Sequence, residues 1–160
     1  MAEWKDCGKQ FPRFLWQRGV SILPANPTLK QPTLETWKEY QSRKPTKAEL
    51  QDWKTKYWNQ GAGYFALCGP VSDNLIVLDF DSELLWANFQ RRIDDLNLLK
   101  GNIDDLNMPD IYSFPVIKTN RGYHLYCKLK QSVKTGKFPW GEIRGSGGGA
   151  MSPPSQHPEG

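Results

Sequence analysis

The sequence predicts an α+β domain in which helices flank a mixed or antiparallel sheet. Three observations support this fold class: apolar runs of strand length, segments whose apolar residues recur at helical spacing, and short turns between neighbouring strands. The chain has 160 residues, which suits one domain, and we expect residues 1–160 to form a single unit. Its 38% hydrophobic and 12% aromatic residues are too many for an intrinsically disordered chain.

The first elements are expected to be a helix and a strand. The helix begins near Pro12 and ends at Gly19, because proline is favoured in a first turn and glycine just after a last one. A short strand over 20–24 follows, then a loop with three prolines. The composition of 33–43 predicts another short helix.

A capping box marks the start of the next helix. Thr46 and Glu49 are three residues apart, so each side chain can bond the backbone N–H of the other residue. Apolar residues at helical spacing then predict a helix over 47–58.

Two apolar runs in the middle of the chain are predicted to be adjacent strands. They cover 64–69 and 74–81, and the four residues between them predict a tight turn. A helix over 82–99 comes next. Its expected buried stripe consists of Leu84, Leu85, Phe89, Ile93 and Leu96.

The last third of the chain predicts a hairpin and one more strand. Strands over 115–119 and 123–129 are joined by Asn-Arg-Gly, and a short strand covers 142–144. The segment 100–113 is polar and predicts a loop with some helix, and 130–141 predicts a basic connector. The 16 residues that follow the short strand hold five glycines, which is typical of a flexible linker, although their Ser-Pro-Pro-Ser-Gln-His stretch is not linker composition. Because the sequence stops inside a loop, we expect it to be a C-terminally truncated piece of a longer protein.

Composition restricts the class of protein. The three cysteines are widely spaced and form no Cys-x-x-Cys pair, which excludes a disulfide framework and argues against structural zinc. Charges at the N-terminus and the lack of a long apolar run predict a cytoplasmic protein without a membrane span. The net charge of +4 permits a nucleic-acid partner.

Asp79 and Asp81 are the strongest candidates for chemistry. They end an apolar strand, and alternation along the strand places both carboxylates on one face. Two such carboxylates repel each other unless a cation lies between them, and oxygen ligands suit Mg²⁺ or Mn²⁺. The alternative is that Asp81 or Ser82 caps the following helix while the other carboxylate is merely exposed.

Three further segments carry candidate site residues: a histidine, another carboxylate, and a loop with a serine and a histidine. His124 lies in an apolar strand beside a glycine turn, where it is either a phosphate ligand or a core histidine bonded to the backbone. Glu142 shares a strand face with Arg144, which is also the pattern of a surface ion pair. Ser155 and His157 lie on a proline-stiffened loop, which can line a phosphate pocket or form a surface turn.

The order of these motifs resembles one protein family. A strand ending in Asp79-Phe-Asp81 is followed by Thr-x-x-Gly-x-His124, an acidic residue on a short strand, and Pro-Pro-Ser155-x-His157. This order resembles the bifunctional DNA primase/polymerase N-terminal domain (Prim-Pol) of the archaeo-eukaryotic primase superfamily. The resemblance covers about residues 12–160 and implies a primase-like catalytic core with an RRM-like module.

The resemblance also implies an activity. The expected reaction is metal-dependent nucleotidyl transfer from an NTP or dNTP to a 3′-hydroxyl on a DNA template, in plasmid or phage replication. Mg²⁺ or Mn²⁺ would be held by Asp79, Asp81 and Glu142, where the family often has Asp at the third position. The residues expected to bind the nucleotide are His124, Arg121, Arg144, Ser155, His157 and Lys30.

The resemblance implies three partners: a DNA template and primer, a nucleotide, and a fused or separate helicase. Two other functions remain open on the residues alone. One is a non-catalytic module that binds single-stranded nucleic acid through basic loops and tryptophans. The other is a metal-dependent nuclease, which would use the same carboxylates.

Overall fold

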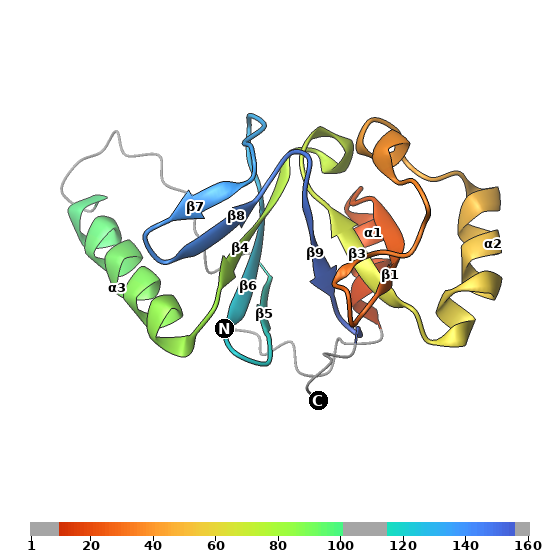
Figure 1. Ribbon diagram of the computed structural model, residues 1–160. Helices are drawn as coiled ribbons and strands as arrows, with labels where there is room; N and C mark the ends of the chain where they lie inside the picture. The colour runs from red at the N-terminus through yellow and green to blue at the C-terminus, as the bar shows by residue number, and fades with distance from the viewer. Residues whose placement is uncertain (1–9, 101–114, 156–160) are drawn as a thin grey trace.

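Two antiparallel sheets lie next to each other, each covered by helices (Figure 1). The computed structural model describes residues 10–100 and 115–155, without the side chains of 96–100. The α+β class predicted from the sequence is confirmed, but the strands form two sheets rather than one.

The first sheet has four strands in the order β2-β1-β3-β9. They are β1 (Ile22–Asn26), β2 (Gln31–Pro32), β3 (Gly63–Leu67) and β9 (Gly149–Ser152). The second sheet has five strands in the order β5-β6-β4-β8-β7. They are β4 (Leu75–Phe80), β5 (Val116–Lys118), β6 (Tyr123–Lys128), β7 (Gly136–Phe138) and β8 (Gly141–Arg144). All pairings between these named strands are antiparallel.

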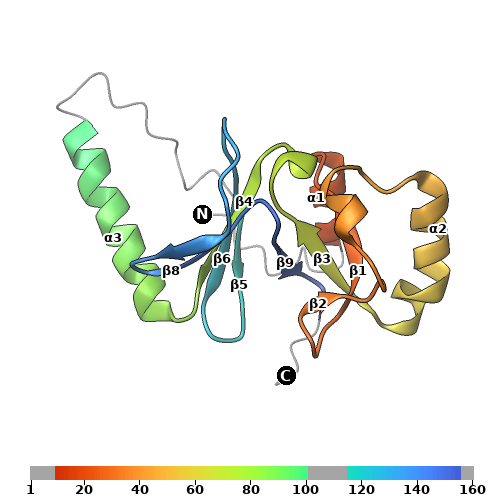
Figure 2. The same cartoon turned by 45° about the horizontal axis from the view of Figure 1, so that its top comes forward.

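The helices surround the two sheets. They are α1 (Phe11–Gln17), α2 (Lys47–Lys56) and α3 (Glu83–Lys100), with short 3₁₀ helices η3 (Lys38–Gln41), η4 (Trp58–Gln60) and η5 (Pro70–Ser72). Figure 2 shows α2 beyond the first sheet and α3 beyond the second, at opposite ends of the molecule.

Three apolar clusters form the core. One contains Trp53 of α2 and packs on the first sheet, and another contains Phe89 of α3 and packs on the second. The third joins the two sheets, because Ala66 of β3 in the first sheet and Val77 of β4 and Tyr126 of β6 in the second all belong to it, together with Phe11 of α1. The Tyr126 hydroxyl also lies 3.1 Å from the Ser152 hydroxyl of β9, so the two sheets share hydrogen bonds as well as apolar surface.

The capping box predicted from the sequence is confirmed. Glu49 N–H donates to the Thr46 hydroxyl at 3.2 Å, and Thr46 N–H donates to the Glu49 carboxylate at 2.7 Å. By contrast, the helix expected over 33–43 is wrong. Only η3 forms there, because Pro32 and the extended residues before it pair with β1 and delay the helical turn.

The adjacent strands predicted over 64–69 and 74–81 are present but do not pair along their length. β3 pairs with β1 and β9, whereas β4 pairs with β6 and β8, and only an isolated bridge joins Gly69 to Leu75. The turn between them therefore carries the chain from one sheet to the other.

Three further predictions need correction: the buried stripe of α3, the glycine-rich linker and the basic connector. Leu84 was expected in the buried stripe of α3 but is 68% exposed, whereas Trp86 is buried instead. Leu96 and most of the loop expected over 100–113 lie outside the residues described in full. The glycine-rich segment expected to be a linker contains β9, which pairs with β3 along its whole length. The basic connector over 130–141 contains β7.

Candidate active site

Three of the predicted site residues lie side by side in one row across the second sheet. Asp79 of β4 is paired with His124 of β6 on one side and with Glu142 of β8 on the other. Residues directly opposite each other in antiparallel strands project from the same face. His124 Nε2 lies 3.3 Å from Asp79 Oδ1, so the residues meet although the chain separates them by dozens of positions.

The row lies where one face of β4 changes from core to surface. Alternation places Leu75, Val77 and Asp79 on the same face. The first two are buried in the cluster shared with α1, whereas the Asp79 side chain is 18% exposed. A polar site therefore continues directly from the apolar core that joins the two sheets, and that core holds it in place.

Arg144 supplies a cation to two of the carboxylates. Its Nη2 lies 3.0 Å from Asp79 Oδ2 and 2.7 Å from Glu142 Oε2. Burial by itself raises the pKa of Asp79, but the hydrogen bonds and positive charges of His124 and Arg144 outweigh it, so this pKa is lowered. In this structure Arg144 and His124 therefore supply the positive charge and hydrogen bonds beside Asp79.

The structure distinguishes between the two residues considered as the cap of α3. Leu85 N–H donates to the Ser82 hydroxyl at 3.2 Å, so Ser82 is the cap. Asp81, which immediately follows β4, is exposed and lines the cleft described below. Its carboxylate is therefore not used in capping the helix.

Two glycines let the neighbouring strands approach the end of β4. A Cβ at Gly122 would overlap the carbonyl oxygen of Phe80, and a Cβ at Gly141 would overlap that of Asp79. Any side chain at either position would push β6 or β8 away from β4. The glycine of the Thr-x-x-Gly-x-His motif thus brings His124 within reach of Asp79.

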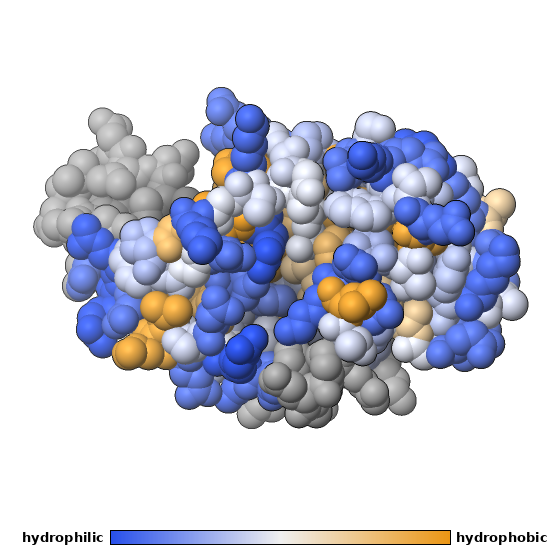
Figure 3. Space-filling view, viewed as in Figure 1, coloured by the Kyte–Doolittle hydropathy of each residue, from blue (hydrophilic) through white to orange (hydrophobic). Residues whose placement is uncertain are grey.

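A cleft of about 860 Å³ lies in front of this row, between the two sheets. Its volume falls in the range of small-molecule sites. Asp79, Asp81, His124 and Arg144 line it from the second sheet and the end of β4, whereas Glu142, which is bonded to Arg144, is not part of its lining. Figure 3 shows mostly hydrophilic side chains over the middle of the second sheet on this face of the molecule.

The other predicted nucleotide ligands are distributed differently. Lys30 and Arg121 both line the cleft. Ser155 also lines it, but its hydroxyl accepts from Tyr64 N–H at 2.8 Å and donates to the Ser152 carbonyl. Ser155 therefore fastens the segment after β9 to β3. His157 lies outside the described residues.

A family model for the bifunctional DNA primase/polymerase, N-terminal domain (Prim-Pol) matches residues 13–160. The chain belongs to the Prim-Pol family. No match was found among curated proteins. Membership indicates a primase/polymerase domain of DNA replication, with nucleotidyl-transfer chemistry and with DNA and nucleotides as substrates. Within the described residues, no helix combines the length and apolar character needed to cross a membrane.

The Prim-Pol carboxylates are of the right chemistry for a divalent cation. Asp79, Asp81 and Glu142 offer only oxygen donors, as Mg²⁺ and Mn²⁺ prefer. In the part of the chain that the structure describes, no three His, Cys, Asp or Glu side chains form a ready metal-ligand group. At this row Arg144 forms ion pairs with both Asp79 and Glu142. By the chemistry of its donors, the set of three carboxylates fits such a cation.

Most of the far wall of the Prim-Pol cleft could not be predicted from the sequence, in which Trp37 could either stack on a base or pack in the core. Trp37, Phe65 and Met151 line it from the first sheet and its connections. A tryptophan near a loop was the only signal available, and packing alone explains most such residues. The wall becomes recognisable only when β9 brings Met151 beside Phe65.

Proposed function

We propose that this chain catalyses metal-dependent nucleotidyl transfer from an NTP or dNTP to a 3′-hydroxyl paired with a DNA template. The observation that carries the proposal is that Asp79 and His124, paired across β4 and β6, line a nucleotide-sized cleft together with Asp81. We further propose plasmid or phage replication, with a fused or separate helicase, as the setting, on the basis of the resemblance alone.

The carboxylates and the cations have separate tasks in this reaction. Asp79, Asp81 and Glu142 would hold Mg²⁺ or Mn²⁺, which when bound neutralises charge on the attacking and leaving oxygens. His124, Arg121 and Lys30 line the same cleft and would donate hydrogen bonds to the triphosphate. Ser155 and His157 remain proposed nucleotide ligands from the resemblance, although the hydroxyl of Ser155 is engaged by backbone groups.

Arg144 would contribute in two states. In the metal-free site its guanidinium neutralises Asp79 and Glu142. A planar guanidinium also binds phosphate oxygens through paired hydrogen bonds, so Arg144 is suited to the triphosphate when the carboxylates are otherwise occupied.

Primer extension tests the proposal. The assay measures primer extension by wild type and by the variants Asp79→Asn and Glu142→Gln. Each protein is supplied with NTPs or dNTPs and with Mg²⁺ or Mn²⁺. We expect extension by wild type and a loss of roughly hundredfold or more in each variant, since even outer-shell changes at metal sites cost about 10–100-fold. Asp52→Asn is the matched control, because Asp52 forms an exposed ion pair with Lys56 on α2.

Three outcomes would overturn the proposal. Extension that survives Asp79→Asn would remove this carboxylate from the chemistry. Degradation of DNA without added nucleotides would indicate a nuclease. Binding of single-stranded DNA without extension under any of these conditions would indicate a non-catalytic module.

A further inference from the structure

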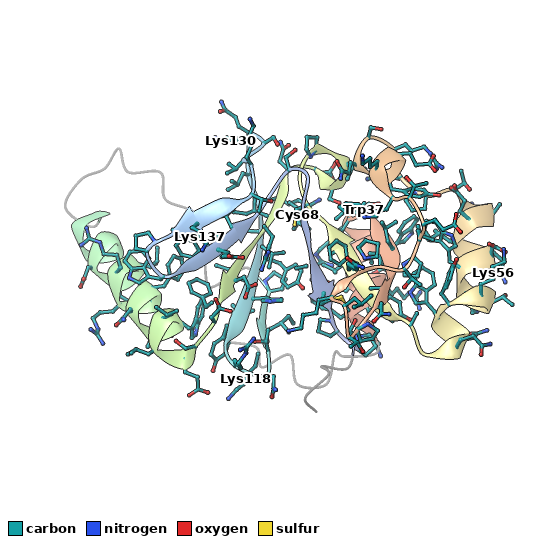
Figure 4. All side chains as sticks on the ribbon, in the orientation of Figure 1. Trp37, Lys56, Cys68, Lys118, Lys130 and Lys137 are labelled. Carbon is teal, nitrogen blue, oxygen red and sulfur yellow. The ribbon has the colours of Figure 1, made fainter. Side chains whose placement is uncertain are left out.

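The cleft has two chemically different walls. The second sheet and its β5–β6 turn contribute charged and polar side chains: Asp79, Asp81, Lys118, Arg121, His124 and Arg144. The opposite wall comes from the first sheet and its connections. Lys30, Ser152 and Ser155 lie on it, but its large apolar side chains are Trp37, Phe65 and Met151. Figure 4 shows Trp37 on the side of the first sheet and Lys118 on the side of the second.

Trp37 is held in position by neighbouring apolar groups. Its indole packs edge-to-face against Phe65, with ring centroids 6.2 Å apart and an interplanar angle of 61°. Phe65 is only 6% exposed and is paired with Met151 across β3 and β9. The Trp37 carbonyl accepts from Tyr40 N–H at 3.1 Å at the start of η3. Trp37 itself is only partly buried, so part of it remains exposed at the cleft.

We infer that Trp37 is the platform on which the base of the incoming nucleotide stacks; this inference rests on the proposed function. A nucleoside triphosphate has one anionic end and one flat, largely apolar end. The charged wall suits the triphosphate, and the apolar wall of the same cleft suits the base. The cleft volume of about 860 Å³ is large enough to hold both ends at once.

A single nucleotide fits this wall better than a template strand. Proteins that bind single strands present several aromatic platforms along a charged groove, one for each successive base. Among the described residues that line this cleft, Trp37 is the one partly exposed large aromatic side chain, because Phe65 and Phe80 are buried. Stacking on an indole tolerates every base, as a template-directed enzyme requires.

Binding measurements with two probes test the role of Trp37. Titration calorimetry of the 160-residue chain in Mn²⁺ compares dATP with inorganic tripolyphosphate, which lacks the base and the sugar. We expect Trp37→Ala to weaken dATP binding about tenfold, or about 1.4 kcal/mol, and to leave tripolyphosphate binding unchanged. Trp37→Phe should retain most of the dATP affinity because it keeps a flat ring.

Two more variants separate stacking from packing. Trp37→Met keeps apolar volume without a flat ring, so it preserves the packing even if Trp37→Ala folds poorly. We expect it to weaken dATP binding about as much as Trp37→Ala does. Trp16→Ala is the matched control, because Trp16 is 39% exposed on α1 and does not line the cleft. We expect it to bind both probes as wild type does.

Each contrary result has a distinct meaning. If wild type binds dATP and Trp37→Met binds it equally well, the inference about Trp37 is wrong and the proposed function stands. The inference is also wrong if Trp37→Met loses affinity for dATP and tripolyphosphate alike. It is wrong as well if Trp37→Met loses affinity for a single-stranded oligonucleotide but still binds dATP. If wild type binds neither probe, the proposed function fails, and the inference fails with it.

Discussion

Asp79 lies directly opposite Glu142 across β4 and β8, and the guanidinium of Arg144 lies 3.0 Å and 2.7 Å from the two carboxylates. Removing this cation would leave two facing anions. We expect Arg144→Gln to lower the free energy of unfolding by about 1–2 kcal/mol at pH 7, because charged hydrogen bonds are lost and repulsion appears.

The loss in Arg144→Gln should depend on pH. Although burial opposes it, the pKa of Asp79 is lowered because His124 and Arg144 favour its charged form, so this stabilisation is present at pH 7 and is lost as the pH falls through the folded-state pKa. The difference from wild type should therefore be smaller at about pH 2 than at pH 7. Urea unfolding at the two pH values measures it, with Arg92→Gln, an exposed change on α3, as the control. An equal loss at both pH values would contradict the role of Arg144 as a counter-cation.

The two aspartates should differ in their effect on stability. Asp79 is partly buried and bonded to His124 and Arg144, whereas Asp81 is exposed. We expect Asp79→Asn to cost about 1 kcal/mol and Asp81→Asn to stay within about 0.5 kcal/mol of wild type. Both variants should lose primer extension. A thermal melt in metal-free buffer checks the first part, and a large loss in Asp81→Asn would indicate a structural role.

His124 should affect the nucleotide more than DNA. It lines the cleft beside Asp79, and a histidine bonded to phosphate contributes a hydrogen bond to a charged group. We expect His124→Ala to weaken nucleotide binding roughly tenfold and to change single-stranded DNA binding little. Parallel titrations with dATP and an oligonucleotide measure both, and equal losses would point to a packing defect at the β4–β6 pairing.

The capping carboxylate of α2 predicts an acid-sensitive contribution to stability. The pKa of Glu49 lies well below its ordinary value, because hydrogen bonds from Arg43 and from Thr46 N–H favour the charged form. A lowered pKa means that the stabilisation is complete above about pH 4.3 and is lost as the pH falls through the folded-state pKa. Glu49→Gln should therefore cost about 1 kcal/mol at pH 7 and progressively less below about pH 4.

Denaturant unfolding between pH 7 and pH 2 measures this contribution. Glu35→Gln, an exposed change in the loop before η3, serves as the control and should leave the pH dependence of stability unchanged. A difference between wild type and Glu49→Gln that stays constant to pH 2 would show that the charge is not responsible.

A pair of glycines gives a matched test of close strand approach. A Cβ at Gly122 overlaps the Phe80 carbonyl, whereas a Cβ at Gly136 of β7 meets nothing within 4 Å. We expect Gly122→Ala to cost more than about 2 kcal/mol and Gly136→Ala to be nearly neutral or slightly stabilising. Urea unfolding compares them. Similar stabilities would show that β6 can shift away from β4 at no cost.

Local features were readable from the sequence because they depend on neighbouring residues. The capping box at Thr46, the start of α1 near Pro12 and the hairpin of β5 and β6 all follow from short-range sterics and hydrogen bonding. The order of the motifs also sufficed to predict that the chain belongs to the Prim-Pol family. Alternation along β4 predicted that Leu78 and Phe80 face away from Asp79, and both belong to the apolar cluster that packs against α3.

Strand partners could not be read in the same way, because pairing is decided between segments far apart in the chain. The apolar runs that became β3 and β4 look like a hairpin, yet each finds better-buried partners in a different sheet. The glycine-rich end looks like a linker, but Gly149 carries no side chain that would collide with Phe65, so β9 can pair with β3 there. Tertiary packing thereby built the cleft and its aromatic wall. It also placed Arg144 between Asp79 and Glu142, since charges on β4 and β8 meet only when those strands pair.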